Sequence, residues 1–383
     1  MRIALVVLCL AIGGATIAAC SDDGSGSSMS EPADDLDAAL EALVEAEGGP
    51  PGVIVVVDQD DDVEVHAAGV AEVGESAPID ADDTVRIAST AKAFSGAAAL
   101  SLVSTGDLSL DATIAEYVPQ YADEWGEVTL AQLLQHTSGV PDFIANPAAQ
   151  SAIGESPDVP LPPDELLDFV ADEPLNFEPG SEYEYSNSDN IAVGLMVESA
   201  TGREYEDVLT ERVYEPLGLD ATSLPEGPEL PTPFAHGYDV SEGEPEDVSE
   251  IFAGGWAWAS GGIISTPNDL NRFIRAYVGG ELFDEAVREQ QLDLLDGAES
   301  SPPGPGENSA GLAIFRYETS CGTVYGHTGN TVGYTQFFAA SDDGNRSVTF
   351  TVTTQLRPDL GEVFDLLREA QELAVCAALE GGE

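Results

Sequence analysis

Apolar and polar positions alternate in a way that predicts strands at both ends of the chain. Near the start, the unbroken apolar run Val53 to Val57 is followed by an acidic turn at 60–62 and the alternating segment 63–66. This arrangement predicts a β-hairpin over Gly52 to Val73. Strand patterns return late in the chain, at 262–264, 311–317, 333–340 and 346–354.

The middle of the chain predicts helices. An alanine-rich segment from Thr90 to Ser104 ends at the stop signal Gly106. Shorter helical patterns lie at 130–135, 163–171 and 191–200, and an amphipathic helix is predicted from about 361 to 379. Strands at both ends with helices between them predict that distant segments complete one sheet. We place the sheet lobe at about 36–88 and 250–383, and an inserted helical lobe at about 89–249.

The first residues predict a processing segment. Arg2, an apolar run and small residues up to Ala19 are typical of a secretory signal peptide over residues 1–19. The sequence that ends in Cys20, Ile-Ala-Ala-Cys, resembles a bacterial lipobox, so we expect lipid modification of Cys20 and a membrane anchor on an exported protein. Plain secretion is the alternative. Residues from Cys20 to about Asp35 are expected to form a flexible tether, and 36–383 the folded domain.

Charge restricts the partners of this protein. The 383 residues include 71 acidic and 12 basic side chains, which gives a formal net charge of −59. Nucleic acid is excluded because a phosphate-binding face needs clustered Lys and Arg. The acidic residues are spread along the whole chain, so we expect a self-repelling surface that suits salty surroundings. The same repulsion predicts a monomer.

Cysteine and histidine positions bear on disulfides and metals. Cys9 lies in the signal segment and Cys20 at its end, which leaves Cys321 and Cys376 in the exported domain. An oxidising compartment then predicts a disulfide between these two. The histidines lack Cys or His companions at ligand spacing, so no metal site and no cofactor are expected. They are His66, His136, His236 and His327.

Lys92 is the only lysine of the chain, and it stands three residues after Ser89. In a helix, two side chains at this separation lie one turn apart on the same face. An amine can lose its proton and act as a base, whereas a guanidinium cannot, and the positive end of the helix dipole disfavours an ammonium there. The pair therefore predicts that neutral Lys92 activates Ser89 as an acylating nucleophile. A serine cap followed by a solvated lysine is the alternative.

Three short motifs together resemble a known family. Ser89-Thr90-Ala91-Lys92, Tyr185-Ser186-Asn187 and His327-Thr328-Gly329 stand in the order found in the serine hydrolases that include class C β-lactamases, D-alanyl-D-alanine carboxypeptidases and related esterases. The resemblance runs from about Val53 to Thr354. Supporting segments lie at 108–111, 133–139 and 260–262. The resemblance implies an α+β fold, with an antiparallel sheet flanked by helices and an inserted helical lobe.

The resemblance also implies a role for each catalytic residue. Ser89 would be acylated, and Lys92 would accept or relay its proton. Tyr185 would pass a proton to the leaving group, unless it is only a buried aromatic. Asn187 would orient Lys92 and the substrate amide, or serve as a turn residue. His327 would polarise Tyr185 or the substrate, and a strand histidine without a chemical role is the alternative.

Substrate contacts are implied around the last motif. By the same resemblance, the backbone amides of Ser89 and Asn330 would form the oxyanion hole, and each such donor is typically worth about 2.7–4 kcal/mol. The segment Thr328, Gly329, Asn330 and Thr331 would bind substrate, although Asn330 departs from the Thr or Ser that peptidase members often carry there. Arg316 would pair with a substrate carboxylate. His136 is expected to be structural. The positions of Cys321 and Cys376 resemble the disulfide of the secreted carboxypeptidases.

These observations predict an exported serine hydrolase that works through an acyl-enzyme on Ser89. The preferred substrate is the D-Ala-D-Ala end of a cell-wall peptide. A β-lactamase and an esterase are the alternatives among enzymes, with a β-lactam or an ester as substrate. A surface lipoprotein that keeps the fold as a ligand-binding scaffold is the non-enzymatic alternative.

Overall fold

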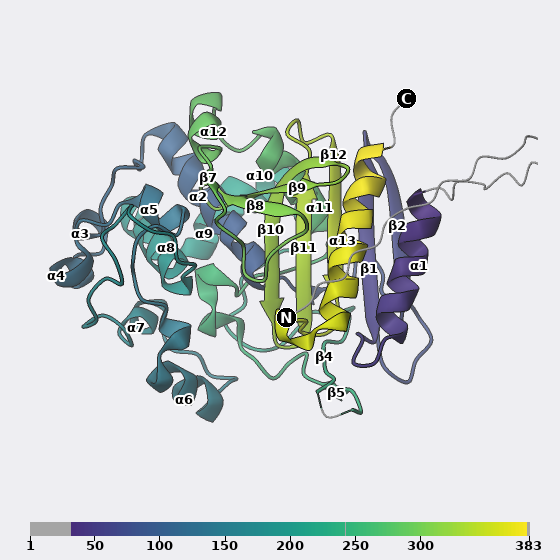
Figure 1. Cartoon of the computed structure of the whole chain (residues 1–383). Coiled ribbons are helices and arrows are strands. Elements are labelled where there is room, and N and C mark those ends of the chain that lie inside the picture. Colours follow the sequence, from purple (N-terminus) through teal and green to yellow (C-terminus); the bar gives the residue numbers. More distant parts are fainter. Residues whose placement is uncertain (1–31, 242, 381–383) are drawn as a thin grey trace, which may run out of the picture.

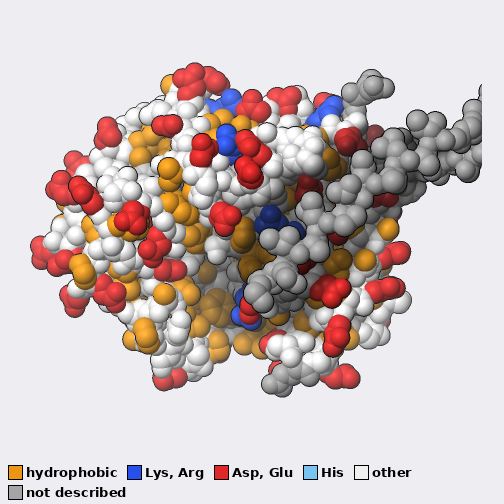
Figure 2. Space-filling model, in the orientation of Figure 1, with side chains coloured by type: hydrophobic (Ala, Val, Ile, Leu, Met, Phe, Trp, Pro, Cys, Tyr) orange, Lys and Arg blue, Asp and Glu red, His pale blue; other side chains and the backbone are white. Residues whose placement is uncertain are grey.

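A computed structural model describes residues 32–241 and 243–380 of the chain (Figure 1). The predicted signal peptide, Cys20 and the tether up to residue 31 lie outside the described residues. Within those residues, no helix combines the length and the apolar character that a membrane span requires. Figure 2 shows Asp and Glu side chains scattered over the whole visible face, with few Lys and Arg among them.

Eight strands form one antiparallel sheet in the order β2-β1-β12-β11-β10-β9-β8-β7. Their bounds are β1 (Gly52–Gln59), β2 (Asp62–Gly69), β7 (Leu295–Asp296), β8 (Glu307–Ala310), β9 (Phe315–Thr319), β10 (Gly322–Thr331), β11 (Tyr334–Ala340) and β12 (Arg346–Val352). β1 pairs with β12, so that Val55 lies opposite Phe350. The prediction that distant segments complete one sheet is therefore confirmed.

Helices cover both faces of this sheet. On one face lie α1 (Pro32–Glu45) and α13 (Glu362–Glu380), and on the other lie α2 (Ala91–Thr105) and α11 (Pro267–Gly279) (Figure 1). Val53, Val55 and Val57 of β1 belong to the core beneath α1 and α13, whereas Ile54 and Val56 belong to the core on the opposite side. The apolar run at 53–57 is unbroken because both faces of the strand are buried.

The predicted tether ends earlier than expected, because helix α1 begins at Pro32. The tether was expected to run to about Asp35, but residues 32–35 form the first turn of α1. Leu36, Leu40 and Leu43 follow at helical spacing and are fully buried against the sheet. This apolar stripe holds the segment in the fold, since burying it removes apolar surface from water.

The segment between β3 (Val85–Arg86) and β6 (Ile264–Ser265) is mostly helical, and α3 to α7 gather on one side of the sheet (Figure 1). Its elements are α3 (Ile114–Tyr117), α4 (Ala122–Trp125), α5 (Leu130–Leu134), α6 (Pro147–Glu155), α7 (Pro163–Leu167), α8 (Asn187–Thr201), α9 (Tyr205–Leu209), α10 (Glu215–Leu217), β4 (Tyr238–Asp239) and β5 (Glu246–Asp247). α12 (Glu285–Gln291) follows α11. The α+β fold class is confirmed.

Two local predictions need correction. The strand expected from residue 311 begins only at Phe315, because Ala313 has a φ of 54° and its amide donates to the Leu134 carbonyl. The helix expected from residue 191 begins four residues earlier, at Asn187. Cys321, just before β10, and Cys376 in α13 are joined by a disulfide with 5.2 Å between their Cα atoms.

Candidate active site

Ser89 lies in a short 3-10 turn, Ala88–Thr90, that leads directly into α2. Ala88 has a φ of 52°, which is uncommon for an alanine, and such backbone strain clusters at functional sites. The Thr90 hydroxyl donates to the Ile87 carbonyl over 2.6 Å and closes the turn. The turn presents the half-buried Ser89 to a cleft of about 600 Å³.

Lys92 is fully buried beside Ser89. Its Nζ atom lies 3.2 Å from Ser89 Oγ, 2.8 Å from Asn187 Oδ1 and 2.7 Å from the Ser260 carbonyl oxygen. Burial lowers the pKa of Lys92 to about 7, although the negative charges of Asp142 and Asp189 oppose the shift. A substantial fraction of the amine is therefore neutral near neutral pH.

The neighbours of Lys92 determine where its lone pair points. The Asn187 and Ser260 oxygens can only accept hydrogen bonds, so a neutral amine directs its two N–H groups to them. The remaining position, which holds the lone pair, faces Ser89, whose hydroxyl can donate. The predicted geometry for proton transfer from Ser89 to Lys92 is thus present.

Asn187 is the first residue of α8 and is held in one orientation. Its Nδ2 atom donates to Asp142 Oδ2 over 3.0 Å, and a carboxylate can only accept. The amide oxygen is therefore directed to Lys92, as the motif predicted. Asp142 was not predicted as a site residue, yet it lines the cleft and fixes this amide.

Tyr185 packs beside Lys92, with 4.9 Å between Nζ and the centre of the phenol ring. Burial raises the pKa of Tyr185 above its ordinary value, and the nearby Ser89 hydroxyl offsets only part of that rise. The phenol therefore keeps its proton. Its hydroxyl has no hydrogen-bond partner of regular geometry among the described residues, which leaves it available to a substrate.

His327 lies in β10 and is fully buried. Its Nδ1 atom is 2.5 Å from the Thr328 carbonyl oxygen, so that nitrogen must carry the proton and Nε2 must be an acceptor. Burial lowers the pKa of His327 to about 3, and the charge of Lys92 adds to this effect. The ring centres of His327 and Tyr185 are 6.4 Å apart, and Nε2 is without a partner among the described residues.

His136 supports Tyr185 from the interior. Its ring centre lies 4.4 Å from that of Tyr185, and its Nδ1 atom is 2.8 Å from Asp189 Oδ2. The Ser138 hydroxyl donates to the other Asp189 oxygen over 2.5 Å. His136 does not line the cleft, which agrees with the structural role expected for it.

Gly329 lets β10 approach the nucleophile closely. A Cβ atom at this position would lie 2.6 Å from the Ile87 carbonyl oxygen and 3.1 Å from the Ser89 amide nitrogen. Asn330 and Thr331, the next two residues, line the cleft. The predicted oxyanion donors, the amides of Ser89 and Asn330, thus belong to residues that line the same cleft.

Two further residues were predicted to contact the substrate, Thr328 and Arg316, and the structure places them differently. Thr328 is buried, and its hydroxyl donates to the Pro302 carbonyl over 2.6 Å, so its side chain supports the cleft wall. Arg316 does not line the cleft. It pairs with Asp296 at 3.0 Å and with Glu318 at 3.4 Å. The prediction that Arg316 receives a substrate carboxylate is therefore wrong, because its guanidinium is held by acidic neighbours outside the site.

Arg357 is the basic residue that the structure places in the cleft instead. It follows β12, is exposed and lies 3.3 Å from Asp359, which also lines the cleft. Sequence reasoning missed it. Its only signal was an arginine just beyond a predicted strand in a chain with few basic residues.

A serine hydroxyl beside a buried lysine amine on this α+β fold is the arrangement of a serine hydrolase. A family model described as Beta-lactamase matches residues 36–372. The chain belongs to this family, and the family resemblance seen in the sequence is confirmed.

Named relatives agree with that assignment. Penicillin-binding protein 4* of Bacillus subtilis is 24% identical over 320 residues, which cover 78% of this chain and 67% of that protein. A D-aminopeptidase of Cereibacter sphaeroides is 30% identical over 321 residues, which cover 81% of this chain but only 58% of that protein. A D-stereospecific amidohydrolase from Streptomyces sp. superposes with a TM-score of 0.75 at 27% identity, over 87% of this chain and 97% of that structure.

Proposed function

We propose that this protein hydrolyses amide bonds beside D-amino acids through an acyl-enzyme on Ser89, and that the D-Ala-D-Ala end of cell-wall peptides is its preferred substrate. The observation that carries the proposal is the buried Lys92 amine, 3.2 Å from Ser89 Oγ and with a pKa lowered to about 7. A base of that pKa near the working pH suits general-base catalysis.

The geometry supports the following sequence of steps. Lys92 takes the hydroxyl proton as Ser89 Oγ attacks the carbonyl carbon, and backbone amides of Ser89 and Asn330 stabilise the oxyanion. Tyr185, which is neutral, gives a proton to the leaving amine as the carbon–nitrogen bond breaks, and the proton that Lys92 took from Ser89 then passes to Tyr185, so that both groups regain their starting state. Water then attacks the acyl-enzyme, releases the acid and returns the proton to Ser89. Asn187 keeps Lys92 oriented throughout.

Arg357 favours a carboxypeptidase among the possible hydrolases. A peptide that is cleaved near its C-terminus must bring its carboxylate into the cleft, and a guanidinium is the side chain best suited to receive it. Arg357 is exposed and lines the same cleft as Ser89 and Thr331. Relatives named as penicillin-binding proteins are consistent with a substrate of this kind.

A second candidate is the removal of a D-residue from the amino end of a peptide. The acidic side chains Asp142 and Asp359 also line the cleft, and a free amino group would find them there. The relatives named D-aminopeptidase support this possibility. Release of D-alanine from a peptide with a blocked N-terminus would select the carboxypeptidase, and release only from a free N-terminus would select the aminopeptidase.

The test begins with acylation. Mass spectrometry after incubation with penicillin is expected to show a covalent adduct that Ser89→Ala abolishes. Ser301→Ala is a matched control, because Ser301 lines the same cleft and is exposed. A long-lived adduct with release of D-alanine from a D-Ala-D-Ala peptide supports the proposal. Rapid penicillin turnover would indicate a β-lactamase, cleavage of acyl esters alone an esterase, and the absence of any adduct a non-enzymatic scaffold.

The proposed cellular location of the protein rests on the signal segment and Cys20, which lie outside the described residues. We propose an exported lipoprotein that is anchored through Cys20 and faces outward, because a peptide of the cell wall is met there. The full-length protein should partition with membranes, and Cys20→Ser should release it into the medium. Equal membrane binding by both would contradict the anchor. Sedimentation of the released protein is expected to show a monomer, as its self-repulsion predicts.

A further inference from the structure

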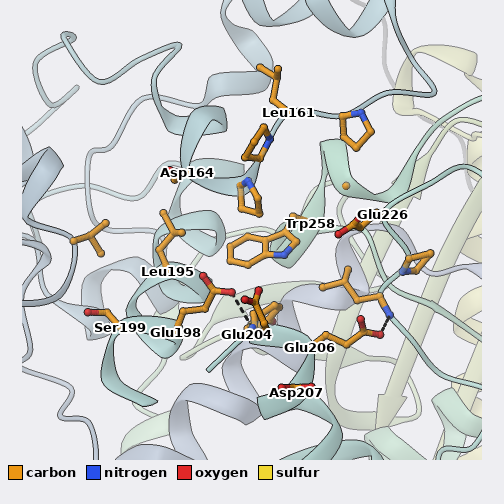
Figure 3. Close-up of a pocket in the computed structure, with 18 of the residues that line it drawn as sticks. Leu161, Asp164, Leu195, Glu198, Ser199, Glu204, Glu206, Asp207, Glu226 and Trp258 are labelled. Atoms are coloured by element: carbon orange, nitrogen blue, oxygen red, sulfur yellow. Dashed lines mark hydrogen bonds between the residues drawn. The ribbon is translucent and has the colours of Figure 1, made fainter. Parts of the chain in front are cut away.

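A second cavity lies behind the active site. It has a volume of about 1130 Å³ and is lined by α8, α9 and the turn that precedes β6 (Figure 3). Trp258 lines this cavity, whereas Ser260, two residues later, lines the Ser89 cleft and accepts a hydrogen bond from Lys92. One short turn thus forms a wall of both cavities.

The cavity is strongly acidic. Six of its twenty lining residues are Asp or Glu, and none of the lining residues is Lys, Arg or His. The acidic residues are Asp164, Glu198, Glu204, Glu206, Asp207 and Glu226. Charge of one sign in a concave site attracts a ligand of opposite charge. In a protein with a net charge of −59, however, charge alone does not distinguish a site.

The Trp258 indole supplies an independent sign of a ligand. Trp258 is 8% exposed. Its N–H group forms no hydrogen bond with the described residues and is not among their fully covered polar atoms, so it is open to the cavity. By contrast, Trp125 and Trp256 donate to the carbonyl oxygens of Glu173 and Ser156 over 3.2 Å and 3.0 Å. A largely buried indole with an unpaired N–H that is open to a cavity can donate to a ligand there. Figure 3 shows this indole in the middle of the cavity lining, with the Glu198 and Glu204 side chains below it.

The structure holds this indole in place. Trp258 has a φ of 37°, a strained value for a large side chain that persists only where packing enforces it. A Cβ atom at Gly194 of α8 would lie 2.6 Å from the indole, so helix and ring are in direct contact. The Tyr205 ring packs on it with 5.0 Å between ring centres. The donor is therefore preorganised, which lowers the entropy cost of binding.

Two carboxylates are held in a similar way. Glu198 accepts a hydrogen bond from the Tyr205 amide over 2.9 Å, and Glu206 accepts one from the Leu224 amide over 3.0 Å. In each case one oxygen is bonded to the backbone, and the other has no hydrogen-bond partner in the part of the chain that the structure describes. Leu195 adds an apolar side chain beside Glu198, and Leu161 lies at the other end of the cavity lining (Figure 3).

We propose that this cavity binds a short organic cation that also carries an amide, such as a basic amino acid amide or the basic residue of a peptide. The carboxylates of Glu198 and Glu204 receive its amine, and the Trp258 N–H donates to its carbonyl oxygen. The alkyl part of the ligand lies on Leu195. A simple counterion would use the charge but not the indole donor.

Three probes separate these contributions. Lysinamide carries the amine and the carbonyl, 1,5-diaminopentane has the amines without the carbonyl, and norleucinamide lacks the side-chain amine. Each is titrated into ¹⁵N-labelled Ser89→Ala protein, which prevents turnover, at about 0.15 M salt, where exposed charges are screened within roughly 8 Å. The signal of the Trp258 indole is assigned with Trp258→Phe. If that variant does not fold, Trp125→Phe and Trp256→Phe assign it by elimination.

Lysinamide is expected to shift the Trp258 signal saturably, and the other two probes to bind about tenfold more weakly, as one lost polar contact predicts. The double variant Glu198→Gln, Glu204→Gln should weaken lysinamide binding by about tenfold or more. Glu41→Gln, Glu45→Gln on the exposed face of α1 removes the same charge and should change nothing. Equal binding of the diamine, an equal loss in both double variants, or an unchanged Trp258 signal would each overturn the proposal.

Discussion

The Nζ atom of Lys92 lies 2.7 Å from the carbonyl oxygen of Ser260, a residue 168 positions away in the chain. Asn187 Oδ1 takes a second hydrogen bond at 2.8 Å, and the third neighbour is Ser89 Oγ. Two fixed acceptors therefore leave one direction for the amine lone pair, and that direction is the nucleophile. The catalytic proposal depends on this arrangement.

Lys92→Arg tests whether the residue is a base or only a charge. Arginine keeps the positive charge but cannot release its proton at working pH. We expect acylation by penicillin to slow by about 10²–10⁴-fold, the usual contribution of a general base. The rate of adduct formation, followed by mass spectrometry, measures the effect. Near-normal acylation in a folded Lys92→Arg protein would refute the assignment of Lys92 as the base.

The pH dependence of acylation should follow Lys92. Its pKa is lowered to about 7 by burial, so kcat/KM for an ester substrate is expected to rise with pH through about 7 and then to level off. His327, whose pKa is lowered to about 3, stays neutral across this range and therefore adds no second step to the pH profile of kcat/KM. A profile that is flat between pH 5 and 9, a range of about two units on either side of that value, would contradict the role of Lys92.

Asp142→Asn should shift the rise of kcat/KM with pH to lower pH. The Asp142 charge raises the pKa of Lys92, so its removal lowers the pKa further. The substituted amide also places an N–H group against Asn187, which favours a flipped Asn187 that presents its own N–H to Lys92. Both effects disfavour the ammonium. Asp359→Asn, in the same cleft but not among the charges that shift Lys92, is the control.

Gly329→Ala should disrupt the oxyanion hole without unfolding the protein. The added Cβ would lie 2.6 Å from the Ile87 carbonyl oxygen and 3.1 Å from the Ser89 amide, so β10 must move away from the nucleophile. Loss of one oxyanion donor typically lowers kcat by about 10²–10³-fold. Gly154→Ala in α6 meets nothing within 4 Å and serves as the control. Full activity of Gly329→Ala would show that this close approach is not required.

Arg357→Gln should affect only substrates that carry a carboxylate. We expect KM for a D-Ala-D-Ala peptide to rise by about tenfold or more, as the loss of a charge-assisted hydrogen bond predicts, and KM for a neutral ester to stay unchanged. Arg316→Gln, outside the cleft, should leave both values unchanged. If Arg316→Gln raises KM for the peptide and Arg357→Gln does not, the substrate carboxylate binds to Arg316 and not to Arg357.

Local patterns predicted the parts of the fold and site that depend on short-range spacing. The run Val53 to Val57 predicted β1 because a strand that is buried on both faces needs no polar alternation. Ser89 and Lys92 were paired because helical geometry alone brings residues three apart together. The segment of α1 also carried a readable signal, Leu36, Leu40 and Leu43 at helical spacing, which its polar surroundings obscured.

Local sequence patterns could not predict contacts between segments that are distant in the chain. Tyr185, Asn187 and His327 were found through family motifs and not through any pattern in the residues themselves. Asp142 and Arg357 lie in loops, where no periodicity indicates which side chain turns toward the cleft. Arg316 was placed in the site by the resemblance, but Asp296 and Glu318 hold it elsewhere. Such ion pairs depend on tertiary structure.

Burial of Lys92 should also be measurable as a pH-dependent cost in stability. Below pH 7 both the folded and unfolded states hold the Lys92 proton, and the folded state bears the full cost of a buried ammonium. Above pH 7 the folded state loses that proton, whereas the unfolded state keeps it up to about 10.5. Stability therefore rises with pH in this window, because the unfolded state binds more protons.

Lys92→Met removes this titration while it keeps a side chain of similar length. The free energy of unfolding of the unsubstituted protein, minus that of Lys92→Met, should increase by about 2–3 kcal/mol between pH 7 and pH 9, at roughly 1.4 kcal/mol per pH unit. Denaturant unfolding of both proteins at the two pH values measures it. Other titrating groups are common to both proteins and cancel in the difference. Parallel stability curves would mean that Lys92 keeps an ordinary pKa in the folded protein, and the assignment of a neutral amine beside Ser89 would then fail.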